Sequence, residues 1–161
     1  MVEWRPRNQV VPAENTMTED NVALGKRWFA EVWNQKRGEA VPELLAADAV
    51  MHGISETGGD VRGPEGFLAM HARLLSAFPD MQIELQDCFG AGDKIVVRWM
   101  ATMRHTGPGL GIAATGAEIR LRGMGIARMA NGKVQETWDN WDRMAMFEQL
   151  EAATKAKAAG G

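Results

Sequence analysis

Apolar positions recur at helical spacing in the first half of the chain. Over about residues 18–36 and again over 63–78 they fall three or four residues apart, which predicts two amphipathic helices. Thr16 and Glu19 stand at the spacing of a capping box, so we expect the first helix to begin there. A short strand at residues 50–52, preceded by a short helix, is predicted between the two long helices.

From Met81 onward the pattern changes to strict alternation. Met81, Ile83 and Leu85 are separated by polar residues, which is the pattern of a strand with one buried face. Three further strands follow, separated by a glycine-rich turn, a loop and an Asn-Gly turn typical of hairpins. The predicted strands span residues 81–86, 94–105, 117–129 and 133–142, and a short helix follows at 144–150.

Helices followed by consecutive antiparallel strands predict an α+β fold, in which the helices gather on one face of a curved sheet. A strongly bent sheet leaves a cone that can hold a ligand, and Gly123 and Gly125 within one predicted strand are consistent with such bending. We expect a single domain over residues 18–150, preceded by an N-terminal arm (1–17) and followed by a C-terminal tail (151–161).

Composition narrows the classes of function. The 161 residues carry a formal net charge of -3, which leaves no basic surplus for binding nucleic acid or anionic membranes. Cys88 is the one cysteine, and the N-terminus lacks the apolar run of a signal peptide. No apolar segment approaches the roughly 20 residues that cross a bilayer. These features predict a cytoplasmic protein without membrane or nucleic-acid partners.

The last predicted strand contains the strongest candidate for chemistry. Alternation places Thr137, Asp139 and Trp141 on one face and Asp142 on the other. Burial raises the pKa of a carboxyl group and suits it to act as a general base near neutral pH. Asp139 is therefore the predicted catalytic base. Asp142 is the alternate, and its position before the last helix also fits a helix cap.

Further side chains are predicted to surround this carboxylate. His105 shares a strand face with apolar neighbours, and Asn34, late in the first helix, can donate an amide hydrogen to a carbonyl oxygen. The predicted substrate-binding set is His52, Trp33, Trp99, Met103 and Trp141. The 11 methionines fit either an adaptable ligand cavity or an ordinary core. Three scattered histidines and one cysteine show no metal-ligand spacing, so no metal site is predicted.

An ordered set of short motifs runs through residues 21–150. It comprises Phe78-Pro79-Asp80, Gly92-Asp93-Lys94-Ile95-Val96-Val97-Arg98, His105-Thr106-Gly107, Thr115-Gly116, Arg128, Gly132-Lys133-Val134, Glu136-Thr137-Trp138, Asp142 and Gln149-Leu150. With this order and spacing the chain resembles the SnoaL-like polyketide cyclases of the nuclear transport factor-like superfamily. It departs from their pattern at Met103-Arg104, where they often have Gly-Thr, and at Thr137, where cyclases tend to have His.

The resemblance implies a cone-shaped α+β barrel, a homodimer formed through the sheet, and acid–base chemistry without metal or organic cofactor. It also implies that Asp139 takes a proton from a carbon beside a carbonyl, while His105 and Asn34 help to bind the substrate.

We therefore expect a cofactor-free enzyme that acts on a mostly apolar or aromatic small molecule bearing a carbonyl or hydroxyl group. The reaction types that begin with such a proton transfer are aldol cyclisation, isomerisation, dehydration and retro-aldol cleavage. The alternative is a non-catalytic dimeric module of the same fold that binds a ligand or another protein. An open pocket lined by Asn34, His52, His105 and Asp139 would favour the enzyme.

Overall fold

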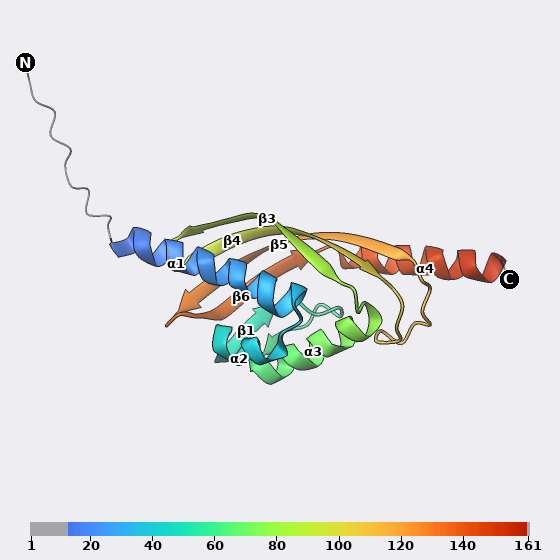
Figure 1. Ribbon diagram of the computed structural model, residues 1–161, viewed down its shortest axis with the longest axis horizontal. Coiled ribbons are helices and arrows are strands. Elements are labelled where there is room, and N and C mark those ends of the chain that lie inside the picture. The colour runs from blue at the N-terminus through green and yellow to red at the C-terminus, as the bar shows by residue number, and fades with distance from the viewer. Residues whose placement is uncertain (1–12, 161) are drawn as a thin grey trace, which may run out of the picture.

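The computed structural model describes residues 13–160 (Figure 1). Its helical elements are α1 (Ala13–Arg27), the π-helix η1 (Trp28–Asn34), the 3-10 helix η2 (Gly38–Ala40), α2 (Val41–Leu44), α3 (Gly63–Ala77) and α4 (Arg143–Ala159). Its strands are β1 (Leu45–His52), β2 (Val61–Arg62), β3 (Gln82–Ala91), β4 (Lys94–Arg104), β5 (Glu118–Ala130) and β6 (Lys133–Trp141). No helix within residues 13–160 has the length and apolar character needed to cross a membrane.

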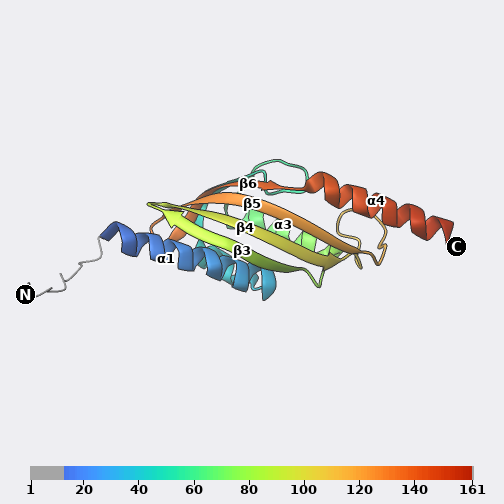
Figure 2. The same cartoon turned by 90° about the horizontal axis from the view of Figure 1, so that it is seen from above.

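The strands form one six-stranded, curved sheet in the order β2-β1-β6-β5-β4-β3. β3 to β6 make the predicted antiparallel meander, whereas β1 runs parallel to β6. The helices α1, α2 and α3 lie on one side of the sheet, and α1 runs alongside β3 and β4 (Figures 1 and 2). The predicted α+β fold, a curved sheet with its helices gathered on one face, is confirmed. The sheet stays open between its edge strands β2 and β3.

The first helix begins earlier than the apolar pattern predicts. α1 starts at Ala13, so Thr16 and Glu19 lie inside the helix and the predicted capping box is wrong. Thr16, Met17, Glu19 and Asp20 are exposed and contribute little to the core, which is why apolar spacing did not mark the true start. The predicted arm, residues 1–17, falls mostly outside the described part of the chain.

The same helix changes form before it ends. From Trp28 it widens into a π-helix, in which the backbone N–H of Gln35 donates to the carbonyl of Ala30 at 3.0 Å. Hydrogen bonds across five residues bring side chains five positions apart onto one face. Trp28 and Trp33 are such a pair, and both are buried. An ordinary α-helix would turn one of these indoles away from the sheet.

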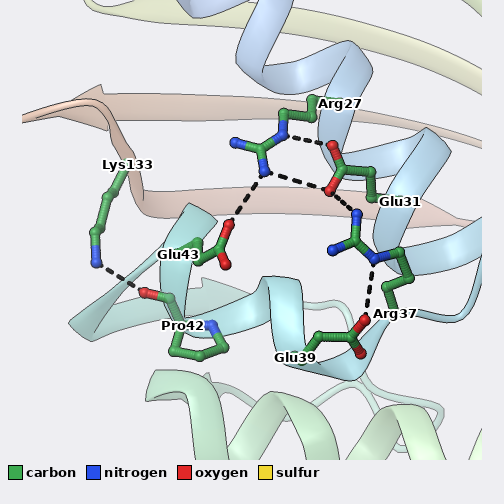
Figure 3. A network of polar contacts seen from close by, with 7 residues as sticks. All are labelled: Arg27, Glu31, Arg37, Glu39, Pro42, Glu43 and Lys133. Atoms are coloured by element: carbon green, nitrogen blue, oxygen red, sulfur yellow. Dashed lines mark hydrogen bonds and ion pairs between the residues drawn. The ribbon is translucent and has the colours of Figure 1, made fainter.

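The π-helix is held from outside by a network of ion pairs. Glu31 accepts a hydrogen bond from Arg27 at 2.5 Å and another from Arg37 at 2.8 Å. Arg27 also reaches Glu43 of α2 at 3.1 Å. Figure 3 shows these contacts joining η1 to α2, beside a bond from Lys133 of β6 to a backbone carbonyl of α2. The network fixes the helix that carries Trp28 and Trp33 relative to α2.

The C-terminal helix is longer than predicted. The segment 151–161 was expected to be a tail, but α4 continues to Ala159. Alanine and lysine are strong helix formers, and Glu151 pairs with Lys155 one turn later at 2.6 Å. The small, repetitive composition therefore favours a helix here. At the other end, Asp142 caps α4 by accepting a hydrogen bond from the backbone N–H of Ala145 at 3.0 Å.

The hydrophobic core lies between α3, η1 and the concave face of the sheet. Phe67 of α3 is fully buried, with its ring centroid 4.8 Å from that of Trp28 and 5.6 Å from that of Trp33. His71 stacks on Phe67 at 5.4 Å and is part of this packing. A cavity lies beside this core on the concave face of the sheet, and Trp28 and Trp33 also line that cavity.

Candidate active site

A largely apolar cavity of about 100 Å³ lies between the concave face of the sheet and the α1–η1 segment. Strands β4, β5 and β6 supply one wall, and η1 supplies the opposite wall with three aromatic side chains. Four of the six tryptophans line the space: Trp28, Trp33, Trp99 and Trp141. Such an apolar enclosure is typical of small-molecule sites.

The inner face of the sheet presents its side chains in rows that cross β4, β5 and β6. The three rows facing the cavity are Ile95–Ala127–Thr137, Val97–Gly125–Asp139 and Trp99–Gly123–Trp141. Alternation along β6 thus brings Thr137, Asp139 and Trp141 to the cavity wall, on the face predicted for them. Asp142 lies beyond β6 as the cap of α4 and is not in the lining.

Asp139 is the one ionisable side chain among the described residues that line the cavity. Burial raises the pKa of this carboxyl to about 6. Two weaker influences favour its charged form, a hydrogen bond from the Thr137 hydroxyl to Oδ2 at 2.5 Å and the charge of His52. The carboxyl group is therefore mostly ionised at pH 7 yet more basic than an ordinary aspartate.

Two glycines of β5 make room for the functional side chains. A Cβ atom at Gly125 would lie 2.9 Å from Asp139 Oδ1, and one at Gly123 would lie 2.3 Å from Cζ2 of Trp99. The carboxylate and the indole therefore lie directly over backbone that has no side chain. The sequence prediction assigned these glycines to sheet curvature, and the structure adds that they create the space beside Asp139.

The loop after β1 lies against the backbone of Asp139. Gly53 adopts φ +73°, and a Cβ there would lie 2.5 Å from the carbonyl oxygen of Asp139. Trp141 Nε1 donates to the carbonyl of Ile54 at 3.1 Å, and Ile54 lines the cavity. The predicted substrate-binding residue Trp141 thus also anchors this loop, and its N–H is already used.

Asn34 and His105 lie outside the cavity lining. The Asn34 side chain accepts from the backbone N–H of Ile83 at 2.7 Å and donates to its carbonyl at 2.8 Å, so it pairs with the edge strand β3. His105 is fully buried, with Nδ1 3.1 Å from the Thr115 hydroxyl and its ring packed on Phe78. Burial lowers the pKa of His105. The structure brings neither side chain to Asp139.

His52 lies on the outer face of the sheet. It follows Met51, which faces the cavity, so strand alternation turns it away. Its ring nitrogens lie 3.0 Å from Asp60 and 3.1 Å from Glu136, and the ring stacks on Trp138. Hydrogen bonds to these two carboxylates raise the pKa of His52. The predicted cavity position of His52 is wrong, because the strand register places it on the opposite face.

The other predicted binding residues do reach the cavity. Trp33, Trp99, Met103 and Trp141 all line it. Sequence reasoning missed Trp28, because the π-helix that turns it inward together with Trp33 has no recognised sequence signal. It also left out Phe29, although ordinary helical spacing places Phe29 on the same face as Trp33. Within residues 13–160, no three His, Cys, Asp or Glu side chains lie close enough together to hold a metal ion.

The chain is similar in sequence to two proteins named as cyclases. The aklanonic acid methyl ester cyclase DnrD of Streptomyces peucetius is 26% identical over 128 residues, which cover 77% of this chain and 86% of the relative. The same enzyme from Streptomyces sp. strain C5, DauD, is 26% identical over 126 residues, with 77% and 78% covered.

Solved structures show the same fold. IdmH of Streptomyces antibioticus, a candidate polyketide cyclase, superposes with a TM-score of 0.71 at 27% identity, covering 81% of this chain and 98% of that one. A candidate SnoaL-like cyclase from Jannaschia sp. CCS1 gives a TM-score of 0.76 at 22% identity, covering 94% and 99%. The family model described as SnoaL-like polyketide cyclase matches residues 23–150. The chain belongs to the SnoaL-like polyketide cyclase family.

Proposed function

We propose that the protein is an acid–base enzyme in which Asp139 removes a proton from a carbon beside a carbonyl group. The observation that carries this proposal is the position of Asp139, the one ionisable side chain among the described residues on the wall of a largely apolar cavity. Buried carboxylates are unusual unless they have a partner or a task. Asp139 has no cationic partner in the lining, so its charge is left available for proton transfer.

The pKa of Asp139 suits this role. A general base works best when its pKa is near the working pH, because it is then both ionised and strongly basic. With a pKa of about 6, the carboxylate of Asp139 is available at neutral pH and binds a proton more tightly than an exposed aspartate does. Burial therefore destabilises the charged form of Asp139 and, for the same reason, makes the carboxylate a stronger base.

The cavity must change shape to hold a large substrate. About 100 Å³ is less than the roughly 150 Å³ of an engineered cavity that binds benzene. Five methionines line the space: Met51, Met81, Met103, Met129 and Met146. Methionine has three rotatable bonds and adapts to irregular apolar surfaces. We propose that these side chains move apart to admit an aromatic, carbonyl-bearing molecule of the polyketide type.

Aldol ring closure is the reaction that the family relationship favours. Two relatives are named aklanonic acid methyl ester cyclases. In such a step, removal of the proton gives an enolate, its carbon attacks a second carbonyl of the same molecule, and the resulting alkoxide is protonated. Protonated Asp139 can return the proton, so the cycle needs no other acid. Isomerisation and dehydration share its first step, whereas retro-aldol cleavage runs in reverse, from removal of a hydroxyl proton to protonation of the enolate carbon.

The test is turnover of aklanonic acid methyl ester and of related aromatic β-keto esters by matched aspartate variants. Asp139→Asn should reduce turnover at least about a hundredfold, the usual scale for losing a general base. Asp142→Asn makes the same chemical change at the helix cap and should retain turnover. Unchanged kinetics in Asp139→Asn would reject the assignment, and a large loss in Asp142→Asn alone would transfer the role. Binding of these compounds with no turnover would favour a non-catalytic module.

We further propose that the protein forms a homodimer through the outer face of the sheet. Phe89, Val96, Ile126 and Trp138 pair with one another across β3, β4, β5 and β6, and form an apolar row on this face. Phe89 is 60% exposed and Ile126 is 41% exposed. Sedimentation of the wild type should give a dimer, and Ile126→Lys should give a monomer. A monomeric wild type would refute the proposal.

A further inference from the structure

We propose that Thr137 is the positioning residue of the catalytic carboxylate. Its hydroxyl holds Asp139 Oδ2 and so leaves Oδ1 as the oxygen that accepts the substrate proton. The inference rests on the proposed function, because it assigns a role within that site.

The contact between the two side chains is local and enclosed. Thr137 and Asp139 lie on the same face of β6, two residues apart, and both line the cavity. Thr137 is only 6% exposed, and its Oγ1 donates to Oδ2 at 2.5 Å. That distance is typical of a hydroxyl bound to a charged carboxylate. The χ1 angle of threonine is stiff because its Cβ is branched, so the donor is held in place.

The two carboxylate oxygens have different surroundings. Oδ2 is occupied by the Thr137 hydroxyl. No group within residues 13–160 donates a hydrogen bond to Oδ1, which lies over the bare backbone of Gly125. The hydroxyl on one side and the glycine below therefore fix the plane of the carboxyl group. Proton transfer from a bound carbon acid then occurs at Oδ1, and the proton leaves from the same oxygen.

This arrangement also stabilises the ion without adding a positive charge to the cavity. A hydroxyl that donates to the charged form lowers the pKa of a carboxyl group. In this site the effect opposes burial and favours the ionised form of Asp139. A lysine or arginine in the same place would lower the pKa much further and weaken the base. Threonine therefore gives orientation at a smaller cost in basicity than a cationic side chain would.

The experiment is an NMR titration of the Asp139 carboxyl carbon in the full-length protein, assigned by its loss in Asp139→Asn. Thr137→Val removes the hydroxyl and keeps the branched shape, and should raise the pKa of Asp139 by about one unit or more. Thr137→Ser keeps a hydroxyl and should stay within about half a unit of the wild type. Thr137→Ala serves as a second hydroxyl-free variant if the valine variant does not fold.

Kinetics provide the second readout. Thr137→Val should lower kcat about tenfold with little change in KM, and should move the acid limb of the pH–rate profile upward with the titration. Thr137→Ser should restore both. An unchanged titration in the hydroxyl-free variants would overturn the positioning role. If the titration shifts but Asp139→Asn turns over normally, the hydrogen bond is real and the general-base assignment is the part that fails.

Discussion

Replacing Asp139 by Asn should stabilise the protein at neutral pH, because it removes a charge from a partly buried, apolar site. The folded-state pKa of Asp139 is about 6, compared with an ordinary value of 3.8. Between these values the unfolded chain has already lost the proton that the folded protein retains. Stability therefore falls as the pH rises from about 4 to about 6, and it stays lowered above that range.

The size of the effect follows from the shift in pKa. One pKa unit corresponds to about 1.36 kcal/mol, so a shift of about two units destabilises the ionised folded state by about 3 kcal/mol. Asparagine is neutral at every pH and keeps an oxygen that can accept from Thr137. Asp139→Asn should therefore gain up to about 3 kcal/mol above pH 7, or roughly 6–12 °C in Tm for a chain of this size. The gain should vanish below about pH 4.

Urea denaturation followed by tryptophan fluorescence, at one protein concentration and across pH 4 to 8, measures this difference. Asp142→Asn is the matched control, because it changes the same side chain at the cap of α4, outside the cavity. Asparagine is about as good a cap as aspartate, so this control should lie near the wild type at every pH. The reasoning fails if Asp139→Asn is less stable than the wild type at pH 7.5, or if its effect does not depend on pH.

Three other variants test separate contacts. Gly125→Ala should reduce turnover at least about tenfold with the fold retained, because the new methyl group would lie 2.9 Å from Oδ1 of Asp139; normal turnover would show that the carboxylate has room to move. Asn34→Ala should lower the free energy of unfolding by about 2 kcal/mol through loss of both bonds to Ile83; unchanged urea stability would contradict those bonds. The pKa of His52 is raised, so His52→Gln should lower Tm at pH 6, and this loss should fade as the pH rises through the folded pKa; an equal loss at pH 9 would exclude the ion pairs.

The position of Asp139 could be predicted because it depends on a local rule. Side chains in a strand alternate, so an acid flanked by Thr137 and Trp141 at two-residue spacing shares their face wherever the strand lies. The apolar composition of that face then indicates burial. Neither step needs knowledge of distant contacts, and the structure shows all three residues on the cavity wall.

The placements of His105 and Asn34 could not be predicted by such local rules. His105 has the parity of Met103, but β4 ends at Arg104, whose backbone N–H donates to Asp80 at 2.7 Å. The backbone of His105 still pairs with Gly116 and Ala117, but the buried ring packs on Phe78 and lies outside the cavity lining. The Asn34 amide pairs with a strand far along the chain. Such long-range hydrogen bonds depend on the assembled fold, so a single sequence cannot reveal them.

The π-helix was likewise beyond sequence patterns. Trp28 and Trp33 stand five residues apart, which reads as two different faces of an ordinary helix. In the structure, the hydrogen bonds of Arg27 and Arg37 to Glu31 and the packing of both indoles on Phe67 accompany the wider turn. The long C-terminal helix, in contrast, could have been predicted from its alanine and lysine content.

Solvent deuterium incorporation tests the central claim most directly, because the proposed aldol ring closure begins with removal of the proton on the carbon beside the carbonyl. Aklanonic acid methyl ester or an aromatic β-keto ester is incubated with the protein in D₂O near neutral pH, and exchange at the carbon beside the carbonyl is followed by NMR. The wild type should accelerate exchange well above the buffer rate, and Asp139→Asn should return it to that rate. Equal acceleration by both proteins would contradict the role of Asp139.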